Sequence, residues 1–428
     1  MSSGQGFWIE ALAAGCGLRF PIIGRLAGEH GHGCGGVKTR RGSRDDDQSG
    51  TCASAQKQKD KGNGRPFAGR HVGNAIEIWH GKEREHAQSR RRLQSPVLFW
   101  RPRRGSATVW RFMGPATPDT VDPAVARRLG ARLVARRCER EQRIWNWKTR
   151  PRDGVMALER FLPVDTLVLR ALQLSGLYGR AHRNFLDVRI VEHPVKLRGL
   201  PEAFAGFRLL QITDLHCDLD PVLIDGVIEK MGMTQWDLAV LTGDYHNRIG
   251  DPYGVSLELM RKLIPHLGPR PLGILGNHDF LRMVPALEAA GLRILLNENV
   301  ALTRGDEVLW ICGVDDPHSM RTEDLRKARE GVPASGCAIL LSHSPETHLA
   351  AASLGYALQL SGHTHGGQLC LPGGVSVLHR ARIPRPLVAG AWRQGDMAGY
   401  TSRGTGACAV AARLNCPAEM TLHILEPE

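Results

Sequence analysis

In the C-terminal half of the chain, short hydrophobic runs alternate with amphipathic stretches. The runs at 207–212, 237–241 and 272–275 have the length and composition of buried strands, and the stretches at 221–231 and 252–267 have helical spacing. Strand–helix–strand units of this size predict a mainly parallel sheet with functional residues at the carboxyl ends of its strands. Later runs lie closer together, which favours a second antiparallel or mixed sheet from residues 294–296, 300–303, 308–312, 338–341, 358–360, 408–414 and 420–425.

The chain before this region has a different pattern. Residues 1–105 are rich in glycine and charge without periodicity, and such a composition buries too little apolar surface to offset the chain entropy. We expect a disordered basic extension there, and an alternative hypothesis is a natural start at a later methionine such as Met113 or Met156. Residues 106–199 are expected to form a helical, basic amphipathic region, and residues 200–428 the main domain.

Two amphipathic stretches precede the main domain, at 123–149 and 155–177. Leucines on one face and basic residues on the other are compatible with an anionic membrane surface, with nucleic acid, or with a solvated face on a helix that packs against the main domain. Trp145 and Trp147 favour the membrane surface, because tryptophan concentrates at membrane interfaces. We therefore expect membrane-surface contact through residues 123–177.

The net charge of +13 comes from the N-terminal third. Residues 1–150 contain 29 Lys or Arg and 13 Asp or Glu, whereas residues 151–428 contain 27 and 30, so nucleic acid is not an expected partner of the main domain. None of the ten cysteines forms a Cys-x-x-Cys pair, and no segment reaches the roughly 18–20 uncharged apolar residues of a membrane-spanning helix. We expect a cytoplasmic protein with reduced thiols, and peripheral membrane association as the alternative.

Polar side chains follow five of the predicted strands at their carboxyl ends. An aspartate in such a place often caps the next helix, and a histidine can be a satisfied core residue, so each block alone has an ordinary explanation. Five blocks in succession are better explained by one site at the sheet edge. They supply carboxylate, amide and imidazole ligands without a thiolate, a set suited to Mn, Fe or Zn in an open site. The candidate ligands are Asp214, His216, Asp244, Asn277, His343, His363 and His365.

The order of these blocks resembles that of the calcineurin-like metallophosphoesterase superfamily, over about residues 200–428. The matching blocks are Asp-x-His at 214–216, Gly-Asp at 243–244, Gly-Asn-His-Asp at 276–279, His343, and Gly-His-x-His at 362–365. The resemblance implies an α/β fold, a four-layer α/β/β/α sandwich with two mixed sheets, and a centre of two divalent metal ions. It assigns one ion to Asp214, His216, Asp244 and His365, and the second to Asp244, Asn277, His343 and His363, with Asp244 as the bridge.

The same resemblance implies that a metal-bridging hydroxide hydrolyses a phosphate ester or pyrophosphate bond. His278 is then expected to donate a hydrogen bond to phosphate or to protonate the leaving oxygen, and Asp279 to support the ligands. Many members have a second Asp, which orients the catalytic histidine, where this chain has Asn247, so the partner of His278 is an open question. Arg248 is expected to contact substrate phosphate, with an ordinary surface arginine as the alternative.

Three segments narrow the expected substrate. Residues 362–368, 402–404 and 415–419 are similar to a bacterial branch that includes membrane-associated phosphoesterases and a UDP-2,3-diacylglucosamine pyrophosphatase of lipid A assembly. This similarity favours a lipid-linked or nucleotide-lipid substrate such as UDP-2,3-diacylglucosamine. A nuclease-type phosphodiesterase of the same fold is one alternative. A non-catalytic basic protein that binds nucleic acid or membrane is an alternative of another class.

Overall fold

Alternating side chains along the central strands divide the apolar residues between separate layers. In β2 (Arg208–Ile212), Leu209 belongs to a cluster that lies between two sheets, whereas Leu210 and Ile212 belong to a cluster that includes helices. β8 (Ala338–Leu341) has the same alternation, because its first and third residues face helices and its second and fourth face the inter-sheet cluster. Strands buried on both faces are expected where helices cover both outer sides of a two-sheet structure.

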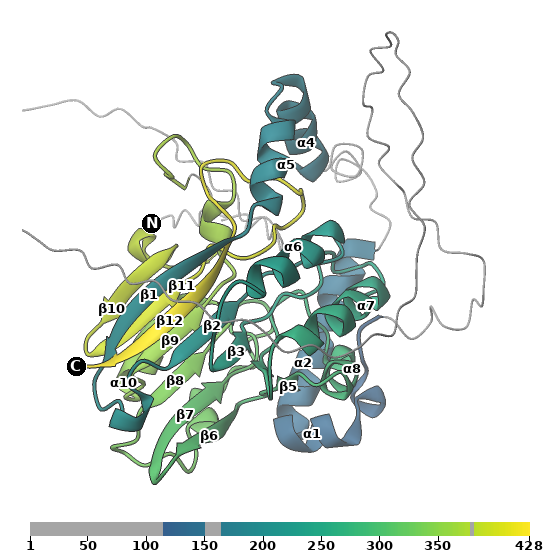
Figure 1. Cartoon of the computed structure of the whole chain (residues 1–428). Helices are drawn as coiled ribbons and strands as arrows, with labels where there is room; N and C mark the ends of the chain where they lie inside the picture. The colour runs from purple at the N-terminus through teal and green to yellow at the C-terminus, as the bar shows by residue number, and fades with distance from the viewer. Residues whose placement is uncertain (1–113, 150–163, 377–380) are drawn as a thin grey trace, which may run out of the picture. The chain divides into compact units, whose positions relative to one another are not determined.

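The computed structural model describes residues 114–149, 164–376 and 381–428, and all of them belong to one compact unit (Figure 1). The predictions for residues 1–105, including the alternative starts, lie outside the described residues. So does the beginning of the stretch predicted at 155–177.

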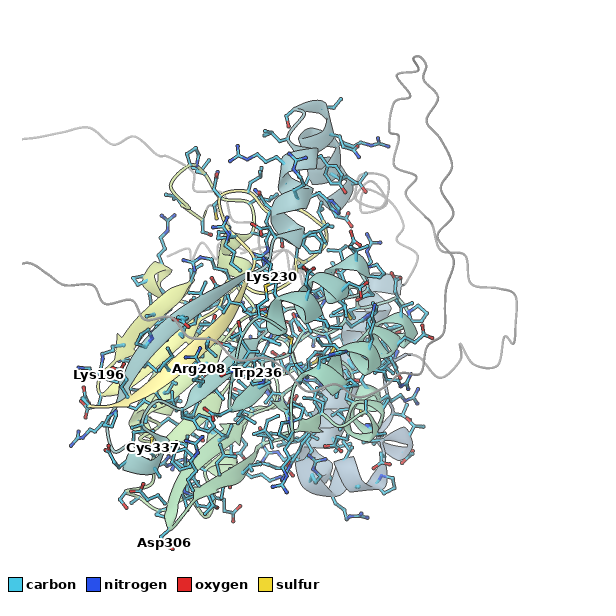
Figure 2. The ribbon with its side chains drawn as sticks, viewed as in Figure 1. Lys196, Arg208, Lys230, Trp236, Asp306 and Cys337 are labelled. Atoms are coloured by element: carbon cyan, nitrogen blue, oxygen red, sulfur yellow. The ribbon has the colours of Figure 1, made fainter. Side chains whose placement is uncertain are left out.

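The first sheet has six strands, and its central part is parallel. β2 to β5 follow one another in parallel, whereas the C-terminal strand pairs antiparallel with β2 on one side and parallel with β1 on the other. Arg208 begins β2 and Trp236 precedes β3, so both mark the amino-terminal edge of this sheet (Figure 2). The order is β1 (Arg189–Leu197), β12 (Glu419–Pro427), β2, β3 (Leu238–Leu241), β4 (Leu272–Gly273) and β5 (Arg293–Ile294).

The second sheet also has six strands and is mixed. Its four inner strands are parallel, and the strand at each edge pairs antiparallel with its neighbour. The order is β10 (Gly390–Gln394), β11 (Met397–Thr401), β9 (Leu358–Ser361), β8, β7 (Glu307–Gly313) and β6 (Glu298–Arg304). Two mixed sheets between helices confirm the α/β/β/α sandwich predicted from the sequence.

Helices cover the outer face of each sheet (Figure 1). The first sheet packs against α1 (Pro123–Leu129), α2 (Ala131–Thr149), α6 (Val222–Met231), α7 (Gly254–Leu263) and α8 (Val284–Ala289). The second sheet packs against α9 (Leu325–Ala328) and α10 (His348–Ser353), and a smaller cluster joins α4 (Val164–Leu174) and α5 (Tyr178–Leu186) to residues 410–414. None of the described helices is long and apolar enough to cross a bilayer.

Two predicted elements differ from those observed, and three strands were not predicted. The stretch 123–149 forms two helices, because Gly130 has φ +90° and ends α1. The run 408–414 was predicted as a strand and forms bends, since Ala409 has φ +68°, which is incompatible with extended backbone. The strands β1, β10 and β11 were not predicted, and β1 lies in the region expected to be helical.

The basic helix α2 packs into the domain through several of its polar residues. Arg137 is fully buried and donates to Glu141 (Nε–Oε1 3.0 Å) and Asp315 (Nη1–Oδ1 2.8 Å). Trp145, which was interpreted as a membrane anchor, packs edge-on against Phe280 with ring centroids 6.0 Å apart. Packing within the domain thus accounts for Arg137, Glu141 and Trp145 of α2, and none of these contacts indicates membrane contact.

Candidate metal centre

The carboxyl ends of strands from both sheets bring the predicted ligands together. Asp214 and His216 follow β2, Asp244 follows β3, and Asn277 follows β4 in the first sheet. The second sheet contributes residues that follow β8 and β9, namely His343, His363 and His365. All seven side chains are buried, and contacts between them join them into one cluster.

Five of these seven residues have a backbone conformation that is uncommon for residues with a side chain. A positive φ is sparsely populated outside glycine, and it persists where the surrounding structure enforces it. Such residues cluster at functional sites, where the backbone must turn sharply to aim a side chain. The φ angles are 53° for Asp214, 40° for His216, 58° for Asp244, 67° for His363 and 51° for His365.

The first half of the cluster is centred on two facing imidazoles. His216 Nε2 lies 3.3 Å from His365 Nε2, and the two rings are nearly parallel. His365 Nε2 lies 3.4 Å from Asp214 Oδ1, and His216 Nε2 lies 3.6 Å from Asp244 Oδ2. Two nitrogens bound at 2.0–2.1 Å to one tetrahedral ion would lie about 3.3–3.4 Å apart, so the observed spacing suits a shared cation.

The second half is centred on His343. Its Nε2 lies 3.2 Å from Asp244 Oδ2 and 3.1 Å from Asn277 Oδ1. Ligand atoms of Asp244, His343 and His363 all lie within 4.8 Å of one another. Among the described residues, buried His363 Nε2 has no hydrogen-bond partner, which is an expensive arrangement unless an ion binds there. Asp244 therefore adjoins both halves.

Backbone carbonyls fix two of the imidazole rings. His216 Nδ1 donates to the carbonyl oxygen of His246 at 2.8 Å, and His343 Nδ1 donates to that of Thr242 at 2.7 Å. A carbonyl can only accept, so in the neutral ring the Nε2 atom carries the lone pair and is directed into the cluster. Carbonyl contacts of this kind typically orient metal-ligating histidines.

Burial and charge shift the pKa values of the cluster in opposite directions. Burial raises the pKa of the Asp214 carboxyl to about 6. Burial opposes the charge of Asp244, but the neighbouring His343 holds the pKa of Asp244 well below its usual range. Burial also opposes a charged His343, yet Asp244 raises the pKa of His343 to about 10. Burial lowers the pKa of His216 to about 3 and that of His363 well below its usual range. The negative charge of Asp244 and the positive charge of His343 thus stabilise each other.

Glycines let the ligand loops approach one another closely. A Cβ at Gly362 would lie 2.3 Å from Asp214 Oδ2, and a Cβ at Gly276 would lie 2.1 Å from Asp244 Oδ1. Both distances are far below van der Waals contact, so any side chain there would displace a candidate ligand. Each glycine thus positions a carboxylate.

Asp279 holds the backbone of the two loops that carry Asp244 and Asn277, in line with the supporting role expected from the sequence. Its carboxylate accepts from the backbone N–H groups of Asp244 (2.8 Å), Tyr245 (2.9 Å) and Gly276 (2.9 Å), with a longer contact from His246 (3.3 Å). The buried Arg137 donates to the carbonyl oxygens of the same loop, at Asp279 (2.7 Å) and Gly276 (3.3 Å). Helix α2 therefore holds the loop that carries Asn277.

His278 lies beside the cluster and contacts a backbone carbonyl oxygen. A ring nitrogen of His278 lies within 4.8 Å of ligand atoms of His216 and Asp244. Its Nδ1 donates to the backbone carbonyl oxygen of Asn247, while the Asn247 side chain accepts from the N–H of Ala409 at 3.1 Å. The contact that fixes the His278 ring thus comes from the backbone at residue 247 and not from the Asn247 side chain.

Arg248 has a different environment from that of the ligands. Its Nη2 lies 2.8 Å from Asp165 Oδ2 on α4, and its side chain is 57% exposed. The substrate contact predicted for Arg248 is untested by this geometry.

Two residues near the cluster were not predicted from the sequence. Ligand atoms of Cys408, His216 and His365 lie within 4.8 Å of one another, so a thiol adjoins a site that was expected to have none. The ring of His318 lies against that of His363, with centroids 4.1 Å apart, and its Nδ1 lies 3.1 Å from Glu346 Oε2. Unlike the candidate ligands, Cys408 does not directly follow a predicted strand. Its only sequence signal was its position shortly after Ser402-Arg403-Gly404.

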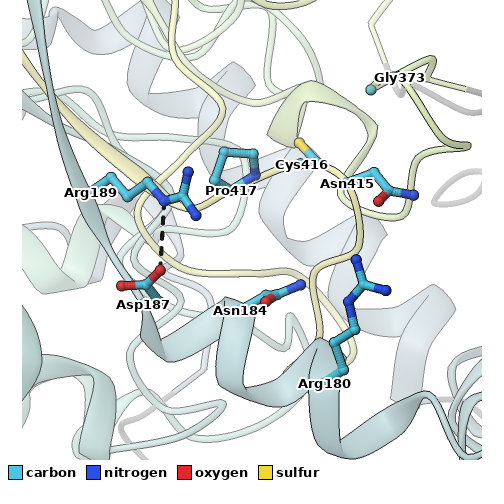
Figure 3. Close-up of a pocket in the computed structure, with 9 residues that line it drawn as sticks. Arg180, Asn184, Asp187, Arg189, Gly373, Asn415, Cys416 and Pro417 are labelled. Atoms are coloured by element: carbon cyan, nitrogen blue, oxygen red, sulfur yellow. Dashed lines mark ion pairs between the residues drawn. The ribbon is translucent and has the colours of Figure 1, made fainter.

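A pocket of about 390 Å³ lies between residues 180–189 and the segments 373–374 and 415–417 (Figure 3). Cys416 lines it, and the Cys416 thiol donates to the carbonyl oxygen of His365 at 3.2 Å. Arg180 and Arg189 also line it, and Arg189 pairs with Asp187 (Nε–Oδ2 3.5 Å). None of the candidate ligands lines this pocket, and the Cys416 thiol connects its wall to the backbone of His365.

Comparison with known proteins gives the family. Residues 207–367 match the calcineurin-like phosphoesterase family. An uncharacterized metallophosphoesterase of Aquifex aeolicus is 30% identical over 217 residues, which cover 47% of this chain and 77% of the relative. The chain belongs to the calcineurin-like metallophosphoesterase family, and it is therefore a hydrolase of phosphoester bonds from a metal-dependent family.

Two further relatives agree with this assignment. The uncharacterized metallophosphoesterase YkoQ of Bacillus subtilis is 27% identical over 255 residues, covering 57% of this chain and 93% of YkoQ. The phosphodiesterase YaeI of Escherichia coli is 26% identical over 232 residues, covering 51% of this chain and 82% of YaeI.

Proposed function

We propose that the seven ligands bind two divalent cations and that the protein hydrolyses a phosphodiester or pyrophosphate bond there. The observation that carries this proposal is the convergence of five strand ends on Asp244, which adjoins His216 on one side and His343 on the other. Bound cations would supply Lewis-acid activation of the phosphate and lower the pKa of a coordinated water. The oxygen and imidazole donors are compatible with Mn, Fe or Zn.

The residues around the cations have separate roles in this proposal. Asp214 and Asp244 neutralise positive charge and fix the spacing of the two halves. The carbonyl-anchored rings of His216 and His343 hold their Nε2 atoms in place, which avoids reorganisation when substrate binds. Burial of the whole cluster excludes bulk water and strengthens each electrostatic contact.

His278 is proposed to protonate the leaving oxygen. Its Nδ1–H donates to the Asn247 carbonyl oxygen, so the protonated ring offers its second proton at Nε2. A partly exposed histidine beside a buried cluster has access to both substrate and solvent, as an acid that must be reprotonated in each cycle requires.

The substrate is proposed to carry a lipid. Leu167, Leu174 and Leu177 are 47%, 89% and 41% exposed around α4 and the turn that follows it. Helices α4 and α5 pack through Leu172 and Ala181 onto residues 410 and 412. These residues are close in sequence to Cys408, which lies at the cluster. Exposed leucines on a helix that packs next to residues 408–412 would suit a substrate presented by a bilayer. The narrower prediction, UDP-2,3-diacylglucosamine, rests on sequence similarity.

Membrane contact can be tested with vesicles of phosphatidylcholine and phosphatidylglycerol. Leu174→Asp should lower co-sedimentation of the protein with these vesicles, because it places a charge in the apolar edge. Met233→Asp is the matched control, since Met233 is 72% exposed on another part of the surface. Equal binding of both variants and wild type would contradict contact through α4.

The reaction itself is tested with purified protein, Mn²⁺ and three substrates. We expect turnover of bis-p-nitrophenyl phosphate and of UDP-2,3-diacylglucosamine, and little cleavage of duplex DNA, whereas a nuclease would show the opposite preference. Asp244→Asn should abolish turnover of every substrate, because both halves of the cluster use this carboxylate. Full metal-dependent turnover by Asp244→Asn would refute the assignment of Asp244 as a metal ligand. If the wild type cleaves bis-p-nitrophenyl phosphate but not UDP-2,3-diacylglucosamine, the lipid substrate is wrong and the phosphoesterase class stands.

A further inference from the structure

The backbone around Cys408 is fixed against the metal cluster by two side chains. The amide of Gln368 clamps residue 408 on both sides, because its Oε1 accepts from the Cys408 N–H (2.9 Å) and its Nε2 donates to the Cys408 carbonyl oxygen (3.1 Å). The N–H of Ala409 donates to Asn247 Oδ1 at 3.1 Å, and Ala409 has φ +68°. Such a strained, doubly held turn places the Cys408 side chain reproducibly.

The Cys408 sulfur meets the first half of the cluster. Sγ and a ring nitrogen from each of His216 and His365 lie within 4.8 Å of one another, and all three residues are buried. The two Nε2 atoms are 3.3 Å apart, the spacing of two ligands on one small cation. A thiolate at this place would add a soft donor to the two imidazoles and the carboxylates of the same cation.

Other buried thiols near the cluster have different partners. Cys217 Sγ donates to the carbonyl oxygen of Tyr245 (3.2 Å), and Cys370 Sγ donates to that of Gly366 (3.2 Å). Among the described residues, Cys408 is the cysteine that groups with two candidate imidazole ligands.

We propose that Cys408 is a thiolate ligand of the cation held by His216 and His365. The proposal rests on the metal centre proposed above and deepens it. A thiolate among imidazole and carboxylate donors makes this half of the centre softer, so it selects Zn²⁺ or Co²⁺ over Mn²⁺. The other half, with Asn277 and Asp244 oxygens and two imidazoles, keeps the harder donor set. The two halves thus differ in metal preference.

The test is the absorption spectrum of the full-length protein loaded with Co²⁺. Wild type should show thiolate-to-cobalt charge transfer in the near ultraviolet together with ligand-field bands in the visible. Cys408→Ser should lose the charge-transfer band and keep the ligand-field bands, and Cys217→Ser should keep both. Zinc affinity of Cys408→Ser should fall by about tenfold or more, while its Mn²⁺ affinity should change far less.

Two outcomes would overturn the proposal in different ways. An unchanged near-ultraviolet band in Cys408→Ser, or equal losses of Zn²⁺ and Mn²⁺ affinity, would show that the sulfur only orients a neighbouring ring. Absence of any cobalt bands in wild type would refute the metal centre itself, and with it the proposed function. Circular dichroism and thermal unfolding of each variant verify that loss of a band is not loss of the fold.

Discussion

At the residue scale, the seven candidate ligands could be predicted because each follows a recognisable buried strand. The position of Cys408 could not be predicted, because the residues before it form bends. A local sequence pattern does not determine the path of such irregular backbone. The partner of His278 was equally hidden, because it is the backbone carbonyl of Asn247 and every residue has a carbonyl. Sequence identifies side chains well and backbone roles poorly.

His278→Asn should lower kcat by about 10²–10⁴-fold, as expected when a positioned proton donor is lost. The loss should be smaller for p-nitrophenyl esters than for alkyl esters, because a good leaving group needs less protonation. Steady-state kinetics with both esters, alongside metal analysis, measures this. His266→Asn, at an exposed histidine, is the control. Loss of bound metal in His278→Asn would instead make this residue a ligand.

At the element scale, strand prediction succeeded for most continuous apolar runs, the run 408–414 excepted, and missed strands whose apolar runs are interrupted. β1 is exposed or half-buried along much of its length. Its sequence is therefore mixed in polarity, with Pro194 in the middle, and contains no continuous apolar run. β11 is fully buried yet contains Gly399, whose missing Cβ leaves room for the ring of Trp392. In both strands the stabilising contacts come from distant partners, which a local pattern does not contain.

Arg137→Met should destabilise the protein by about 3–5 kcal/mol, because Glu141 and Asp315 would be left as buried charges without their common partner. Urea unfolding gives the free energy of unfolding for the variant and wild type. The neighbouring exposed Arg136→Met is the matched control and should change stability little. If both variants unfold at the same urea concentration, α2 does not stabilise the site through Arg137.

The buried histidine on β12, beside its partner on β1, should make the stability of the protein depend on pH. His423 is fully buried between His193 (Nδ1–Nδ1 3.0 Å) and Gln211 (Nε2–Oε1 3.0 Å), and burial holds the pKa of His423 well below 6.5. Below pH 6.5 the unfolded chain binds a proton that the folded state excludes, so stability falls by about 1.4 kcal/mol per pH unit for this group and is fully present above pH 6.5.

This dependence is measured by urea unfolding at pH 7.5 and 5.5. For each protein, the free energy of unfolding at pH 5.5 is compared with that of the same protein at pH 7.5. His423→Gln should lose less of this free energy than wild type. His266→Gln should behave like wild type. An identical loss in His423→Gln and wild type would assign the acid sensitivity to other groups.

At the scale of the whole molecule, metal binding should stabilise the fold. The cluster joins the carboxyl ends of strands from both sheets, so a cation bound there cross-links the two halves of the sandwich. Removing metal with a chelator should lower the melting temperature, and an excess of cation at 100 times the Kd should restore about 2.7 kcal/mol per site. Calorimetry with and without Mn²⁺ measures the shift, and equal melting temperatures would contradict metal binding to the folded state.

The most direct test of the two-cation centre is the metal content of the loaded protein. After incubation with Mn²⁺ and gel filtration, plasma mass spectrometry should find about two ions per wild-type chain, since the ligands divide into two halves around Asp244. Asp244→Asn should retain about one ion or fewer, while His266→Asn should match wild type. Two ions in Asp244→Asn, or none in wild type, would contradict the account.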